Sequence, residues 1–121
     1  EESLSEVALQ QLTWKPDVSR NVALKIAEHS MKDRIFYPDE IDFSFVPAQD
    51  ANCVGTAFMR LRLAGIIEQT GRFRKADRKK RPARRGGMVC QWRLVSYKRA
   101  ETFCHRNNFV PNITNGQMLL V

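Results

Sequence analysis

The side chains best suited to act on another molecule are the cations between residues 72 and 85, which we call the basic segment. This stretch, RFRKADRKKRPARR, holds nine of the 20 Lys and Arg residues of the 121-residue chain and one of its 13 acids. The rest of the chain holds 11 basic and 12 acidic residues, so the formal net charge of +7 arises almost wholly here. A field this local attracts polyanions, and nucleic-acid phosphates above all.

Arginine dominates the basic segment, with six Arg to three Lys. The guanidinium group suits bidentate phosphate contacts and narrow minor grooves. Pro82 and the glycines that flank the segment favour a loop that becomes ordered on binding. The candidate nucleic-acid contacts in this segment are Arg72, Arg74, Lys75, Arg78, Lys79, Lys80, Arg81, Arg84 and Arg85.

Enzyme motifs are absent from the sequence. It contains no Gly-rich phosphate loop, no GxSxG nucleophile motif and no HExxH pair. The acids Asp39, Glu40 and Asp42 cluster at a predicted helix start, where carboxylates favour the helix dipole. We therefore expect no catalytic residues, no cofactor and no enzymatic activity.

Metal-binding patterns are also weak. The three cysteines Cys53, Cys90 and Cys104 form no CxxC pair, and His29 and His105 lack ligands at short paired spacings. No metal site is expected. An odd cysteine number fits a reducing, intracellular setting, in the cytoplasm and nucleoid or in a eukaryotic nucleus. No apolar run approaches the roughly 20 residues of a membrane span, so no membrane partner is expected.

Helical periodicity organises the first half of the chain. Residues 1–14 fit a short amphipathic helix that ends before Pro16, and residues 19–32 fit a second helix capped by Ser19. A brief extended run at 35–37 precedes PDEIDFSF, residues 38–45, which we predict to be a short helix because Pro and acids suit a first turn.

The strongest helical pattern covers residues 50–64. One face is apolar and should face the core: Ala51, Val54, Ala57, Phe58 and Leu61. The outer face carries Asn52, Thr56 and Arg60, with Arg62 on a flank, and these side chains can contact base edges or phosphates. Met59 and Leu63 make that outer face partly apolar. An ordinary solvated face has the same composition, so both readings stay open.

The second half fits a β-hairpin with the basic segment at its tip. A short strand at 66–69 is followed by a loop over 72–87, and residues 88–97 alternate as a half-buried strand with Met88, Cys90, Trp92 and Leu94 on one side. Residues 98–108 fit one or two helical turns. The apolar residues 118–121 suit an edge strand, core packing or a continuation of the chain equally well.

The order helix, short helix, helix, strand, basic loop, strand resembles the winged-helix form of the helix-turn-helix. The resemblance covers roughly residues 19–97 and is carried by VGTAFMRLRLAGIIEQTG and MVCQWRLV. It implies an α+β fold: a three-helix helix-turn-helix core with a β-hairpin wing, preceded by an N-terminal helix and linker (1–18) and followed by a C-terminal helix and tail (98–121).

The same resemblance implies double-stranded DNA as partner, with the third helix in the major groove and the wing, residues 72–87, on phosphates or the minor groove. Two alternatives remain. The first is an RNA-binding module, because arginine-rich segments also bind structured RNA. The second is a protein-interaction adaptor in a nucleoprotein complex, because some winged helices bind protein. A protein partner or self-association would then use the N-terminal helix or the C-terminal tail.

Overall fold

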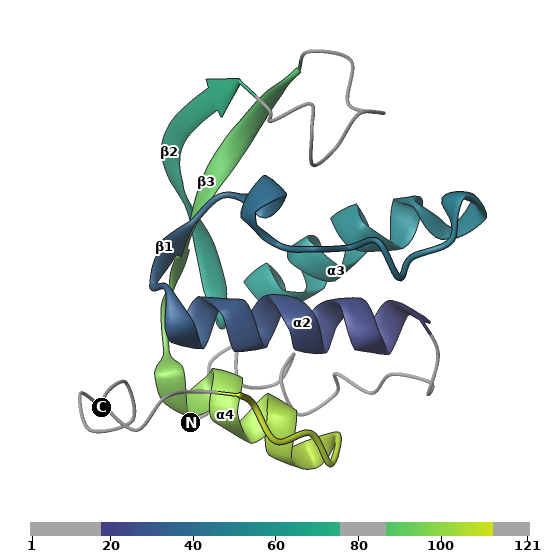
Figure 1. Cartoon of the computed structure of the whole chain (residues 1–121). Helices are drawn as coiled ribbons and strands as arrows, with labels where there is room; N and C mark the ends of the chain where they lie inside the picture. The colour runs from purple at the N-terminus through teal and green to yellow at the C-terminus, as the bar shows by residue number, and fades with distance from the viewer. Residues whose placement is uncertain (1–17, 76–86, 113–121) are drawn as a thin grey trace.

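The computed structural model describes residues 18–75 and 87–112, and within them the chain folds as α+β (Figure 1). Three helices, α2 (Val18–Lys32), α3 (Asn52–Leu63) and α4 (Tyr97–Arg106), accompany one antiparallel sheet of three strands, β1 (Ile35–Phe36), β2 (Ile67–Lys75) and β3 (Met88–Leu94). The predicted helix over 1–14 and the apolar residues 118–121 lie outside the described residues. No helix in the described part is long and apolar enough to cross a membrane.

Helix α2 is the centre of the core. The prediction of a helix over 19–32 is confirmed, although the helix already includes Ser19 and begins at Val18, the first described residue. Its apolar side is completely enclosed, since Val22, Ile26 and Ala27 have no exposed surface. In Figure 1, α2 lies between α3 and α4. The apolar residues of α2 therefore pack against two helices, which cover both sides of α2.

Helix α4 belongs to the same core. Ser96 caps it, because its hydroxyl accepts a hydrogen bond from the Arg99 N–H at 3.2 Å. Ala100, Phe103 and Cys104 are buried in the core cluster that contains the apolar sides of α2 and α3. The helical turns expected at 98–108 are thus present, and they pack on the helical core as an integral part of it.

The sheet has the strand order β1-β3-β2. The extended run predicted at 35–37 forms β1, which pairs antiparallel with β3 through Ile35 opposite Arg93 and Phe36 opposite Trp92. Periodicity alone does not reveal this pairing, because the partners lie 56 or more residues apart in the chain. Trp92 also packs on Phe58 of α3 at 5.1 Å between ring centroids, which joins the sheet to the helices.

The helix predicted over 38–45 is wrong. Only Pro38–Glu40 is helical, as a 3-10 turn (η1), and the backbone is already extended at Ile41 (φ −97°, ψ 134°). The carboxylate of Asp42 then accepts the Ser44 N–H at 2.9 Å, which also lowers the pKa of Asp42. This local bond competes with helical hydrogen bonding and favours a turn. A second 3-10 turn, η2 (Ala48–Asp50), leads into α3. Two 3-10 turns therefore take the place of the second helix of the predicted three-helix core.

The hairpin extends further than the sequence indicates, and the predicted loop 72–87 is too long. Strand β2 continues to Lys75, so residues 72–75 of the basic segment are strand, and β3 begins at Met88. The register shifts between Gln69 and Phe73, where three β2 residues oppose one β3 residue. Gly71, with φ +90°, supplies the backbone conformation that this bulge needs. Pairing thus resumes beyond the core.

The predicted alternation of β3 holds only near the core. Trp92 and Leu94 are buried as expected, but Met88 is 58% exposed and its neighbour Val89 is enclosed instead. The change falls in the part of β3 that pairs with β2 beyond the bulge. The distal hairpin therefore has its own pattern of burial.

The buried thiol of Cys104 gives a test of this packing. Burial raises its pKa to about 12, with smaller contributions from Glu28 and Glu101. Because the thiolate is the nucleophile, its population at pH 8 is about a thousandfold below that of an ordinary thiol. We expect Cys104 to resist iodoacetamide in the folded protein and to react in denaturant, whereas the partly exposed Cys53 reacts in both. Peptide mass spectrometry measures this, and equal native rates at the two cysteines would contradict the packing of α4.

Candidate nucleic-acid interface

Helix α3 presents one core face and one open face, as its period predicts. Val54, Ala57, Phe58 and Leu61 are buried. Ala51 is an exception to the prediction, since it precedes the helix and is exposed. On the open side, Asn52 and Thr56 are exposed and Arg60 is half-buried. These three lie at successive spacings of four, which places them along one stripe of the helix.

The stripe has apolar neighbours. Met59 is 45% and Leu63 is 65% exposed, and both fall on the same side of α3 as Asn52 and Thr56. The Thr56 hydroxyl is 3.3 Å from the Asn52 carbonyl oxygen, to which it donates a hydrogen bond within the helix. Its lone pairs and the Asn52 amide remain on the exposed side. The open face of α3 therefore combines polar donors and acceptors with two apolar side chains.

Arg74 differs from the other predicted contacts, because it is bound within the protein. Its guanidinium donates to the fully buried carboxylate of Asp39 at 2.5 Å and lies 3.8 Å from Glu40. It also stacks over the Tyr37 ring, 4.2 Å from the centroid. A buried carboxylate needs such a partner. Arg74 therefore holds the hairpin to η1, and much of its charge is already compensated.

The other predicted contacts in the described part of the hairpin are Arg72 and Lys75, and both are exposed. Phe73, between them, pairs with Cys90 across the hairpin and is 59% exposed. Side chains of directly opposed residues lie on one face of a sheet, and Lys75 follows Phe73 by two residues. Lys75, Phe73 and Cys90 thus share a face, and Arg74 lies on the opposite one.

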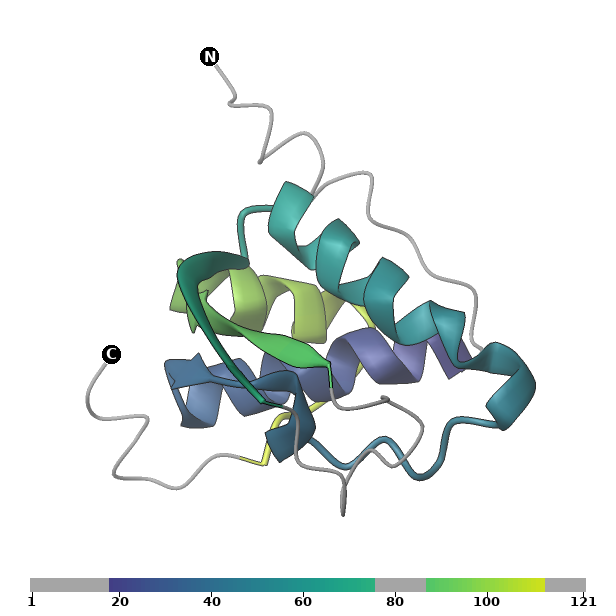
Figure 2. The same cartoon turned by 90° about the horizontal axis from the view of Figure 1, so that it is seen from above.

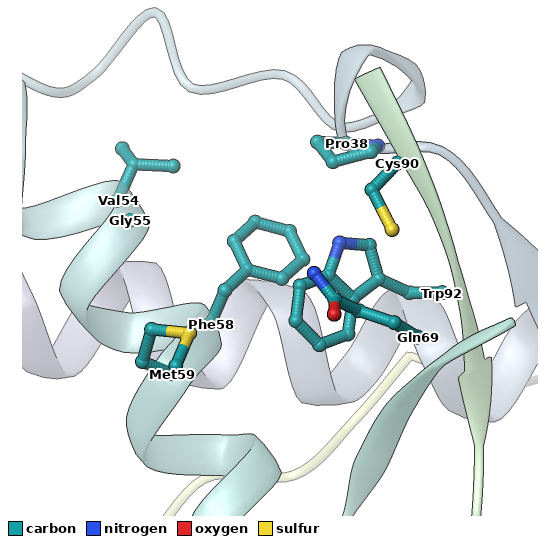
Figure 3. A pocket seen from close by; sticks show the side chains of 8 residues that line it. All are labelled: Pro38, Val54, Gly55, Phe58, Met59, Gln69, Cys90 and Trp92. Atoms are coloured by element: carbon teal, nitrogen blue, oxygen red, sulfur yellow. The ribbon is translucent and has the colours of Figure 1, made fainter. Parts of the chain in front are cut away.

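A hollow of about 270 Å³ separates α3 from the hairpin (Figure 3). The side chains around it are largely apolar. It is lined by Pro38, Val54, Gly55, Phe58, Met59, Gln69, Cys90 and Trp92. Burial raises the pKa of the Cys90 thiol, and the charge of Arg62 on α3 opposes that rise. Met59 belongs both to the wall of the hollow and to the open face of α3.

The structure consequently divides the predicted site. Asn52, Thr56, Arg60 and Arg62 lie on α3, whose residues Val54, Gly55, Phe58 and Met59 line the hollow. Lys75 lies on the hairpin face that Cys90 shares. Arg74 is internal. The other predicted contacts, Arg78, Lys79, Lys80, Arg81, Arg84 and Arg85, lie outside the described residues. Figure 2 shows, from above, the hairpin beside α3.

Sequence reasoning missed the residues that anchor the hairpin. The sequence predicts Tyr37 in an extended run and Asp39 and Glu40 at a helix start, whereas Asp39 is the buried partner of Arg74. The only sequence signal for this role is the opposite charge of Asp39 and Arg74, which lie 35 residues apart.

Comparisons with family models, with curated proteins and with solved structures found no match for this chain.

The anchoring role of Arg74 predicts an asymmetry between two ion pairs of the hairpin. Arg74→Met keeps most of the aliphatic stem but leaves the Asp39 carboxylate buried without that cation, so we expect a loss of about 2–3 kcal/mol in the free energy of unfolding. Arg93→Met is the matched control: Arg93 pairs with Glu68, and their side chains are 53% and 41% exposed. It should cost at most about 1 kcal/mol. Urea unfolding measures both, and equal losses would contradict the anchor.

Proposed function

We propose that this chain is a non-enzymatic, winged-helix DNA-binding module. In this proposal α3 faces the major groove, and the connection between β2 and β3, with most of the basic segment, contacts phosphates or the minor groove. The observation that carries the proposal is the direct succession of α3 and a hairpin that holds the segment at its tip. Only Ala64, Gly65 and Ile66 separate α3 from β2.

The element order supports the fold assignment. A helix, a short strand, two helical turns, a helix and a two-stranded hairpin follow one another, with the short strand paired to the second hairpin strand. Apart from the short strand, this is the order of helix, short helical element, helix and basic hairpin that resembles the winged-helix family. Here the position of their second helix is taken by η1, η2 and the turn between them, so α3 is oriented mainly by α2 and Trp92.

Charge and dimensions also support the proposal. From residue 51 to 75 the chain has one acid, Glu68, which is paired with Arg93, against five Lys or Arg. A 12-residue helix is roughly 18 Å long, and the major groove, about 12 Å wide, admits an α-helix. Asn52, Thr56 and Arg60 offer the amide, hydroxyl and guanidinium groups that read base edges or bind phosphate.

The basic segment should determine the salt dependence of binding. Each neutralised phosphate contributes about 0.9 to the slope of log K against log salt. Changing Lys79, Lys80, Arg81, Arg84 and Arg85 together to Ala should therefore weaken binding to random duplex and flatten the slope by up to about 4.5. Fluorescence anisotropy at several salt concentrations measures the slope.

The control removes the same charge elsewhere, from α2, the following turn and α4. It changes Lys25, Lys32, Arg34, Lys98 and Arg106 to Ala. We expect its slope to stay close to that of the unchanged protein. Equal slopes for the two quintuple variants would refute a specific role of the segment. Competition with duplex RNA and with single strands, in the same titration, distinguishes DNA from RNA as the preferred ligand.

The hollow favours a second candidate, a winged-helix adaptor that binds protein. Its apolar lining, with the exposed Met59 and Leu63 beside it, suits an apolar side chain of a partner. This candidate predicts that Met59→Lys abolishes capture of a partner while duplex affinity is unaffected by changes in the basic segment.

A further inference from the structure

Three potential metal ligands converge where α2 meets η1. His29 lies in the last turn of α2, Asp33 follows the helix, and Glu40 ends η1. The His29 Nε2 atom is 3.9 Å from Asp33 Oδ2 and 3.7 Å from Glu40 Oε1. One donor atom from each of the three residues lies within 4.8 Å of the other two. The cluster brings one imidazole and two carboxylates to a single point.

The imidazole is fixed in place and its Nε2 is unsatisfied. The ring packs edge-on against Phe36, with centroids 5.2 Å apart and planes at 71°. The Nε2 atom is enclosed and has no hydrogen-bond partner among the described residues. Buried polar atoms without a partner are uncommon because they lose the hydration they had in the unfolded chain. The two carboxylates are too far away to form a hydrogen bond with it, but they leave a gap of the size an ion bridges.

The carboxylate of Glu40 is oriented by its other oxygen. Its Oε2 accepts the Tyr37 N–H at 3.1 Å and lies 3.8 Å from Arg74. The Oε1 atom is thereby directed at His29. Such outer contacts fix ligands at metal sites. Asp33 is the adjustable member, since 65% of its side chain is exposed and it stands one helical turn after His29.

We propose that His29, Asp33 and Glu40 bind a divalent transition-metal ion, best matched by Zn²⁺ with water completing the coordination. Zinc takes imidazole nitrogen and carboxylate oxygen at about 2.0–2.2 Å, which puts donors of a tetrahedral site roughly 3.4 Å apart. The His29 Nε2 separations of 3.9 and 3.7 Å exceed that value by only a few tenths of an ångström. The donor atoms of all three residues lie within 4.8 Å of one another, so the carboxylates of Asp33 and Glu40 must also move toward each other when the ion binds. The hard ions Mg²⁺ and Ca²⁺ prefer oxygen ligands throughout, so the imidazole selects against them.

The consequence of such an ion is structural. It joins the end of α2 to η1, and Glu40 also neighbours Arg74, which holds β2. Binding only to the folded chain raises stability with ion concentration. The proposal is independent of DNA binding, and its test needs no nucleic acid.

The experiment titrates the whole chain with Zn²⁺ and follows affinity by calorimetry and unfolding by thermal melting. We expect one ion per chain and a rise in Tm. Asp33→Asn and His29→Gln should each weaken binding at least about tenfold and remove the rise. Asp33 is exposed, so Asp33→Asn keeps the fold, which circular dichroism verifies. His105→Gln, at an exposed site on α4, is the matched control and should leave the affinity unchanged.

Co²⁺ identifies the ligands spectroscopically. A site of nitrogen and oxygen donors gives visible d–d bands without a thiolate-to-metal charge-transfer band, and those bands should disappear in Asp33→Asn. Absence of Zn²⁺ binding, unchanged affinity in both ligand variants, or a thiolate band would each overturn the proposal.

Discussion

The buried carboxylate of Asp39 is the constraint on which the arrangement of the hairpin depends. It has no exposed surface, and its charge is met by Arg74 from β2, 35 residues later in the chain. An uncompensated charge at that position would cost several kcal/mol. The distal hairpin is therefore held against η1 by an electrostatic requirement, in a part of the molecule where few apolar side chains hold it. This contact also takes Arg74 out of the set of cations available to an external phosphate.

The hairpin combines two functions that place different demands on its sequence. Near the core, Ile67, Trp92 and Leu94 are buried and join the sheet to the helices. Beyond the bulge at Gly71, the side chains of β2 are exposed and mostly cationic, and pairing with β3 resumes in a shifted register. Arg74 then fixes the direction of the projecting part. The basic segment is thus carried by a positioned hairpin that follows α3 directly in the chain.

The two longest predicted helices and the hairpin follow from local patterns. A 3.6-residue period predicts α2 and α3, and apolar residues on either side of a basic, Gly-bounded stretch predict β2 and β3. The helix predicted over 38–45 fails because Asp42 bonds to Ser44 instead, which is a choice between two local conformations of similar propensity. The roles of Arg74 and of the cluster around His29 could not be predicted from the sequence, since both depend on groups that only tertiary packing brings together. The proposed role of the cations at 76–86 in DNA binding rests on the sequence alone, since these residues lie outside the described part of the chain.

The most direct measurement of the proposed DNA-binding face is an amide chemical-shift map of the isotopically labelled chain titrated with a short random duplex. The account predicts that the shifts concentrate on Asn52, Thr56, Arg60 and Arg62 of α3 and on the hairpin from Arg72 onward, with Lys98, Glu101 and His105 of α4 unaffected. Shifts confined to α4, or an absence of shifts at low salt, would contradict it.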